Sequence, residues 1–192
     1  MPQRQSLLRR ILSPAISRSR RFGSDERGVT AVEFGLLALP FFTLIFAIIE
    51  TAMVFFASQV LDSAVEDASR MIRTGRAQSA DYTLPNFRTL MCGYTFSLFG
   101  DCSQIKIKVA VVAKFADAVA PPAAQVCSGT PVACTWKSDF ENYNAGIRRD
   151  VVQVTAYYRW PLLVVLPYFN LKNQPDNYRL LSATRVFRNE PF

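Results

Sequence analysis

The most pronounced pattern in the sequence is an uninterrupted apolar stretch near its amino-terminal end. Residues 34–49 carry no charged side chain, and apolar residues extend the stretch over residues 29–57. At 1.5 Å per helical residue the uncharged core spans about 24 Å, against about 30 Å for the hydrocarbon layer of a bilayer. We predict a transmembrane helix over residues 29–57, with Glu33 and Glu50 near its two interfaces. A buried core helix is the alternative, but a helix that is apolar on every face and follows a basic tract is not typical of a soluble core.

Beyond Glu50 the apolar residues become restricted to one face. They recur every four residues, at Phe56, Val60, Ala64, Ala68 and Ile72, and the remaining surface carries Asp62, Glu66, Asp67, Arg70 and Arg73. This spacing predicts an amphipathic continuation of the same helix over residues 58–75, with Gly75 as its stop. Glu50 itself is interpreted as a solvated or interfacial residue.

The remaining sequence, residues 76–192, predicts an α+β domain. A short helix is expected over residues 86–99, with apolar residues along one side at Phe87, Leu90, Met91 and Tyr94. Alternating or β-branched stretches predict strands over residues 104–114, 151–160 and 180–187. A loop containing Pro121, Pro122, Gly129 and Pro131 separates the first two strands. We expect an antiparallel sheet of three or more strands packed on the long helix, with Tyr158 and Trp160 as core or sheet residues.

Charge is concentrated at the amino-terminal end. Residues 1–28 contain seven Arg and two acidic residues, so they carry +5 of the net charge of +7. Basic residues beside a membrane span are retained in the cytoplasm, so residues 1–28 are predicted to be a cytoplasmic leader and residues 76–192 an extracytoplasmic domain. No aromatic residues alternate with these Arg, which argues against nucleic-acid binding.

All four cysteines, Cys92, Cys102, Cys127 and Cys134, follow the apolar stretch, on the predicted oxidising side of the membrane. Two disulfides are therefore expected. Three connectivities are possible, and proximity in sequence favours Cys92 with Cys102 and Cys127 with Cys134. A zinc site is the competing interpretation, but the chain has no His and no C-x-x-C pair. No metal and no cofactor are predicted.

A further pattern lies where the basic tract meets the apolar helix. Gly28 directly precedes the apolar stretch, and Glu33 is the fifth residue after it. A Gly at this position lets the backbone lie close in a peptidase site, and cleavage there would leave a new amino terminus on Val29. A carboxylate in lipid costs about 2.5–3.5 kcal/mol at the bilayer centre and less toward an interface. Glu33 therefore favours a cationic partner, which the amine of Val29 in a neighbouring subunit would supply while setting the stagger between helices.

Gly28, Val29 and Glu33 form a pattern that resembles the type IV prepilin signal, and the chain as a whole resembles the TadE-like pseudopilins. The segments that carry this resemblance are residues 26–34, 37–40 and 48–50, the Cys92 and Cys102 pair, and residues 157–162 and 188–191. The resemblance implies cleavage after Gly28 by a prepilin peptidase. It also implies that the chain is a minor component of a tight-adherence (Flp-type) pilus assembly or a type II-like secretion system. Major Flp pilins are very short and carry Glu-Tyr, whereas this chain has Glu33-Phe34 and a large domain, so it is not expected to be the main filament subunit.

The implied partners are the prepilin peptidase, other pseudopilins or pilin subunits, and the inner-membrane assembly platform. The implied location is the inner membrane, as a single-pass protein with a cytoplasmic amino terminus and a periplasmic or extracellular domain. An enzyme is not expected, because the chain has no His and its cysteines are expected to be oxidised. Two further alternatives are an uncleaved membrane anchor of unknown binding role and a secreted protein that begins near Ser58.

Overall fold

The computed structural model describes residues 26–118, 124–164 and 170–192, so most of the predicted leader, together with Pro121 and Pro122, lies outside the described residues. The chain forms two compact units, Met1–Ala47 and Ile48–Phe192. The helices are α2 (Glu26–Arg73), α3 (Arg76–Ser79), α4 (Leu84–Gly93), η1 (Cys102–Gln104) and η2 (Phe115–Asp117). The strands are β1 (Lys106–Val112), β2 (Gln125–Ser128), β3 (Ala133–Trp136), β4 (Asn142–Tyr143), β5 (Val151–Pro161) and β6 (Tyr178–Arg188).

Helix α2 is continuous from the start of the described residues to the predicted stop. It ends because Gly75 adopts a left-handed conformation with a φ of 77°, and its N–H donates to the Ile72 carbonyl at 3.0 Å. A Cβ at Gly75 would overlap the ring of Phe192, so this position requires Gly. The predicted end is therefore confirmed. The helix begins at Glu26, before the predicted start at Val29, because a single helical Gly costs only about 0.5–1 kcal/mol.

The carboxyl-terminal half of α2 is amphipathic, as predicted. Its buried residues are Val54, Ala57, Leu61, Ala64, Val65, Ala68 and Ile72. The predicted inward position of Phe56 is wrong, since its side chain is 56% exposed. A strict four-residue spacing turns by about 40° per step on a helix with 3.6 residues per turn. Counted back from Ile72, it therefore leaves the buried face before it reaches Phe56.

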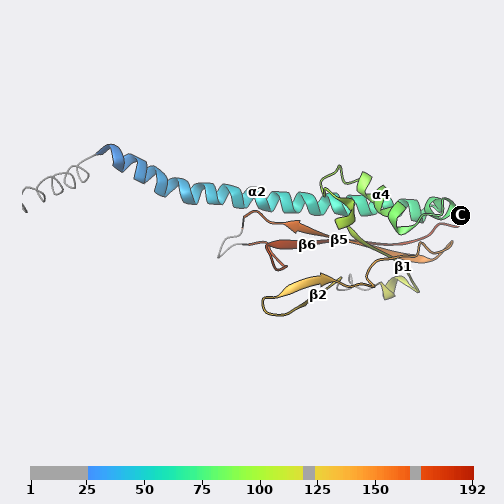
Figure 1. Cartoon of the computed structure of the whole chain (residues 1–192). Helices are drawn as coiled ribbons and strands as arrows, with labels where there is room; N and C mark the ends of the chain where they lie inside the picture. The colour runs from blue at the N-terminus through green and yellow to red at the C-terminus, as the bar shows by residue number, and fades with distance from the viewer. Residues whose placement is uncertain (1–25, 119–123, 165–169) are drawn as a thin grey trace, which may run out of the picture. The chain divides into compact units, whose positions relative to one another are not determined.

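The main sheet has four strands in the order β4-β1-β5-β6. Strand β5 pairs antiparallel with β1 on one side and with β6 on the other, and the two-residue strand β4 pairs parallel with β1. All three predicted strands are confirmed, and only β4 departs from the antiparallel pattern. Within the unit Ile48–Phe192, Figure 1 shows the carboxyl-terminal part of α2 and α4 along one side of this sheet and β2 on the other.

The hydrophobic core lies between α2, α4 and the sheet. Alternate residues of β5, such as Val152, Val154 and Ala156, pack with Ile107 and Val109 of β1 against the buried face of α2. The opposite face of β5 is also buried, because Tyr157 packs edge-on against Phe140 with their ring centroids 5.3 Å apart. Strand β5 is therefore covered on both faces, which explains its nearly continuous apolar sequence.

Two expectations for the domain need correction. The short helix ends at Gly93 and not at Phe99, because Phe96 and Ser97 adopt positive φ angles that a helix does not allow. The predicted loop around Gly129 and Pro131 contains a hairpin, β2 with β3, in which Cys127 lies opposite Cys134. This hairpin contributes to the cover on the second face of the sheet.

Both expected disulfides are present with the favoured connectivity. Cys92, in the last turn of α4, is bonded to Cys102 at the start of η1, and Cys127 is bonded to Cys134 across the β2–β3 hairpin. The first bond ties the end of α4 to the segment that leads into β1. The second closes a short, exposed hairpin.

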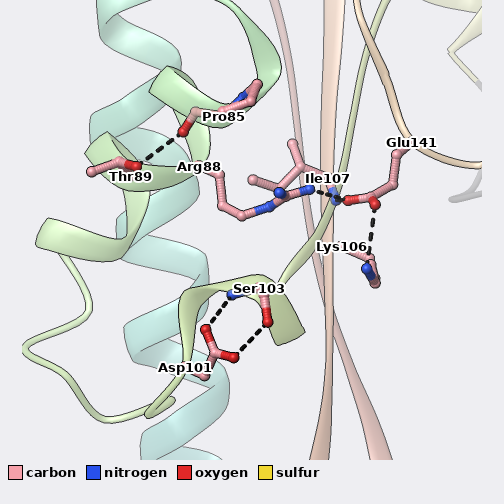
Figure 2. A network of polar contacts seen from close by, with 8 residues as sticks. All are labelled: Pro85, Arg88, Thr89, Asp101, Ser103, Lys106, Ile107 and Glu141. Atoms are coloured by element: carbon pink, nitrogen blue, oxygen red, sulfur yellow. Dashed lines mark hydrogen bonds and ion pairs between the residues drawn. The ribbon is translucent and has the colours of Figure 1, made fainter.

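Polar contacts join α4 to the sheet, as Figure 2 shows. The Glu141 carboxylate accepts from the Arg88 guanidinium of α4, from Lys106 Nζ at 3.3 Å and from the Ile107 N–H at 3.4 Å. Nearby, the Asp101 carboxylate accepts from the backbone N–H and the hydroxyl of Ser103 at 2.9 and 2.6 Å, which lowers the pKa of Asp101. These contacts hold α4, η1, β1 and the segment before β4 together.

Candidate processing site and membrane-spanning helix

Gly28 lies in the first turns of α2, and its surroundings are open. The residue is exposed, and a Cβ added there would meet no heavy atom within 4 Å. Position 28 is helical, although helix ends fray readily because their first N–H groups have no partner within the helix. Packing within the described residues thus does not require Gly at position 28.

Val29 and Glu33 lie on one face of α2, because residues four apart on a helix are neighbours. Both side chains are exposed, Val29 by 53%. Within the described part of the chain the Glu33 carboxylate forms no hydrogen bond or ion pair. The helix therefore presents an unpaired acid on an otherwise apolar surface.

The surface of α2 around Glu33 is almost entirely apolar and exposed. Large apolar side chains with more than two-fifths of their surface exposed are Val29, Val32, Phe34, Leu36, Leu37, Leu39, Phe41, Phe42, Leu44, Phe46, Ile48, Ile49, Met53, Phe55 and Phe56; we call them the apolar band. The Thr43 hydroxyl donates to the Leu39 carbonyl at 2.7 Å, so it needs no outside partner. A core helix would bury such residues, whereas here nearly all are exposed. Within the described residues, α2 is the one helix long and apolar enough to cross a membrane.

The apolar band is not smooth around Pro40. A hollow there is lined by Phe34, Leu37, Ala38, Pro40, Phe41, Phe42 and Leu44. The rings of Phe41 and Phe42 meet edge-on at 5.5 Å, and Phe42 lies 6.4 Å from Phe46. Such a hollow fits an apolar side chain of another helix.

Glu50, at the other end of the predicted span, is not solvated as expected. Its side chain is only 7% exposed, and its Oε1 accepts from the Leu163 N–H at 3.2 Å. The segment that follows β5 covers this carboxylate, so the two acids of the apolar stretch have opposite environments. No sequence signal indicated this contact, because Leu163 is 113 positions away.

Several other charged residues of α2 and the sheet pair with one another. Arg185 of β6 donates to both carboxylate oxygens of Asp62, at 2.9 and 2.7 Å, and this contact raises the pKa of Arg185. Arg185 also reaches Glu66 at 3.4 Å. Together with the ion pairs of Glu141, these contacts join elements of the domain. Among the described residues no group of three or more His, Cys, Asp or Glu side chains is placed to hold a metal ion.

The aromatic residues near the end of β5 are sheet residues, as predicted. The ring of Phe99 lies 4.6 Å from that of Tyr158 and 6.2 Å from that of Trp160. Asn189, in the carboxyl-terminal segment of the resemblance, is buried and donates to the carbonyls of Ala145 and Ile147 at 2.9 and 3.0 Å. These residues stabilise the domain.

Comparison with known protein families gives a match that begins at Gly28. Residues 28–70 match the TadE-like protein family. The resemblance drawn from the sequence is thus confirmed over α2, and it indicates a Tad pilus-associated, membrane-associated protein with an apolar amino-terminal helix. Comparisons with curated proteins and with solved structures gave no match. The TadE-like region therefore comprises Gly28, Val29, Glu33 and the apolar band, and it ends within the amphipathic part of α2.

Proposed function

We propose that this chain is a minor pseudopilin of a tight-adherence (Flp-type) pilus assembly or a type II-like secretion system. In this proposal a prepilin peptidase cleaves the chain after Gly28, and the mature protein assembles through α2. The observation that carries the proposal is that the TadE-like match starts at Gly28 and follows a helix whose apolar side chains are exposed.

The unpaired carboxylate of Glu33 supports assembly through α2. Cleavage after Gly28 would place a positively charged amine on Val29, one helical turn from Glu33 on the same face. In a bundle of such helices, the amine of one subunit pairs with Glu33 of the next. A charge pair in the membrane is strong enough to fix the axial register, because either charge alone is costly there.

The location follows from the charge distribution. The seven Arg of residues 1–28 keep the amino terminus in the cytoplasm, and the domain with its two disulfides lies on the oxidising side of the inner membrane. The partners are the peptidase, other pseudopilins or pilin subunits, and the assembly platform. We propose no catalytic function, because the chain has no His and its four cysteines are paired in disulfides.

Replacing Glu33 tests the assembly step. Glu33→Leu is expected to insert into the membrane and to be cleaved normally, because it makes the helix more apolar and leaves Gly28 in place. Assembly should fail, so pilus output, measured by surface immunoblot, should fall at least tenfold. Thr43→Leu is the matched control, because it also replaces a polar residue of the same helix by Leu, and it should leave output unchanged.

Wild-type output from Glu33→Leu would contradict the proposed role of the carboxylate. Equal loss from Thr43→Leu would show that the helix surface in general, and not the charge at position 33, is required. Glu33→Asp distinguishes further, since it keeps the charge and should retain part of the output.

A further inference from the structure

The segment after β5 that contacts Glu50 carries a large apolar side chain that is exposed to solvent. Leu163 donates its N–H to Glu50, yet its own side chain is 89% exposed. The preceding residue, Leu162, is buried in the core. The backbone at Leu163 is thus held by the core packing of Leu162 and by its own hydrogen bond to Glu50, while the Leu163 side chain is exposed.

Leu163 lies beside the part of the apolar band that follows Ala47. Four residues of α2 that lie close to Glu50 in sequence, namely Ile49, Met53, Phe55 and Phe56, are between 42% and 65% exposed. The band therefore continues beyond the helical turn that Leu163 contacts. Leu163 and the exposed residues around this part of α2 together present apolar surface, here called the apolar patch, that water does not favour.

The length of the predicted span indicates the depth at which this patch lies in the bilayer. Residues 29–57 extend about 43 Å as a helix, which matches a whole bilayer of about 40–45 Å including its headgroup regions. The hydrocarbon layer takes about 20 of these residues, and the rest lie in the interfaces. The residues from about Met53 to Phe56 then lie in the outer interface, and the turn of Glu50 lies at the outer edge of the hydrocarbon layer. Aromatic residues are favoured there.

We propose that Leu163, together with Met53, Phe55 and Phe56, is a second membrane contact, through which the Pro161 end of β5 rests on the lipid interface. The occupant of this surface is lipid, because the patch is continuous along α2 with the apolar band. This inference rests on the proposed membrane span.

The proposal also accounts for the burial of Glu50. A carboxylate at this level faces lipid unless protein covers it, and the Leu163 segment both covers it and supplies an N–H donor. One short segment thus shields the acid and presents an apolar side chain to the bilayer. The domain would then be held against the membrane at two points.

Depth-dependent fluorescence quenching tests this arrangement in the full chain. No cysteine among the described residues is free, so a single introduced cysteine can be labelled with bimane. The protein is placed in lipid nanodiscs, one copy per disc, with lipids that carry a nitroxide either near the headgroup or deep in the acyl chain. Probes are placed at Leu163→Cys, at Phe41→Cys to test the span itself, and at Ile147→Cys as the control.

Ile147 is a matched control because it is also apolar and 71% exposed, but it precedes the opposite end of β5. That strand has 11 residues, so its two ends are separated by about 33 Å. We expect deep nitroxides to quench the Phe41 probe most. Shallow nitroxides should quench the Leu163 probe at least threefold more than the Ile147 probe. Phe56→Cys repeats the test on the helix if the Leu163 variant fails to form its disulfides.

Quenching at Phe41 with equal, weak quenching at Leu163 and Ile147 would overturn this inference and leave the membrane span intact. Absence of lipid quenching at Phe41 would overturn both. A Leu163 probe that neither lipid nitroxides nor soluble iodide can quench is covered by protein, and that result would also overturn the proposed lipid contact.

Discussion

At the residue scale, the two acids of the apolar stretch, Glu33 and Glu50, differ in exposure and in hydrogen bonding. Glu33 is exposed and unpaired within the described residues, whereas Glu50 is buried under Leu163. The first has no partner among the described residues, whereas the second accepts a hydrogen bond from Leu163. Sequence spacing identified Glu33 as the functional candidate but gave no basis for the burial of Glu50, which depends on a contact distant in sequence.

Burial makes the contribution of Tyr143, in β4, to the stability of the domain dependent on pH. Burial raises the pKa of the Tyr143 phenol to about 12 from an ordinary value of 10.0, and the nearby Tyr82 adds to the shift. The folded state thus favours the neutral phenol. Its contribution to stability is complete below pH 10, where the unfolded phenol is also neutral, and is lost as the pH rises toward 12.

Tyr143→Phe should remove this alkaline loss. The Tyr143 hydroxyl is buried and has no hydrogen-bond partner among the described residues, so its removal should also stabilise the domain by about 1 kcal/mol at pH 7. Urea unfolding of the detergent-solubilised chain at pH 7 and between pH 10 and 12 measures both effects. Destabilisation at pH 7 with an unchanged alkaline loss would contradict this account of Tyr143.

At the element scale, the sequence predicted those elements that carry a clear local pattern. Helix α2 and strand β1 bury residues at helical and alternating spacing, and β5 and β6 are rich in β-branched, aromatic or apolar residues, so the existence and approximate bounds of these elements could be predicted. The β2–β3 hairpin could not, because most of its side chains are exposed and leave no alternation in the sequence. Strand β4 has only two residues and exists through its parallel pairing with β1, which is not a local property.

The two disulfides should differ in their effect on stability. Cys92–Cys102 encloses residues that pack in the core, including Phe99, so replacing both cysteines by Ser should lower the free energy of unfolding by about 2–3 kcal/mol. Cys127–Cys134 closes a hairpin in which Val126 and Val132 are exposed, and this hairpin can open locally. Its double Ser variant should lose less than about 1 kcal/mol in urea unfolding. Equal losses would contradict the assignment of the hairpin to the periphery.

At the scale of the whole molecule, the chain combines a domain with its own core and a helix whose apolar surface has no cover within the described residues. The domain is stabilised by its sheet, two disulfides and the salt bridges of Glu141 and Arg185. None of these contacts involves Gly28, Val29 or Glu33, which are exposed on α2. In the proposed function, the chain therefore acts through what the TadE-like helix contacts after cleavage.

The mature amino terminus tests the central claim most directly. The intact mass of the protein purified from its native cell should correspond to a chain that begins at Val29. Gly28→Ala should retain residues 1–28. Gly35→Ala, a change at another helical Gly with open surroundings, should be processed normally. A wild-type protein that still carries its Arg-rich residues 1–28 would contradict the account and leave a membrane-anchored domain without pseudopilin assembly.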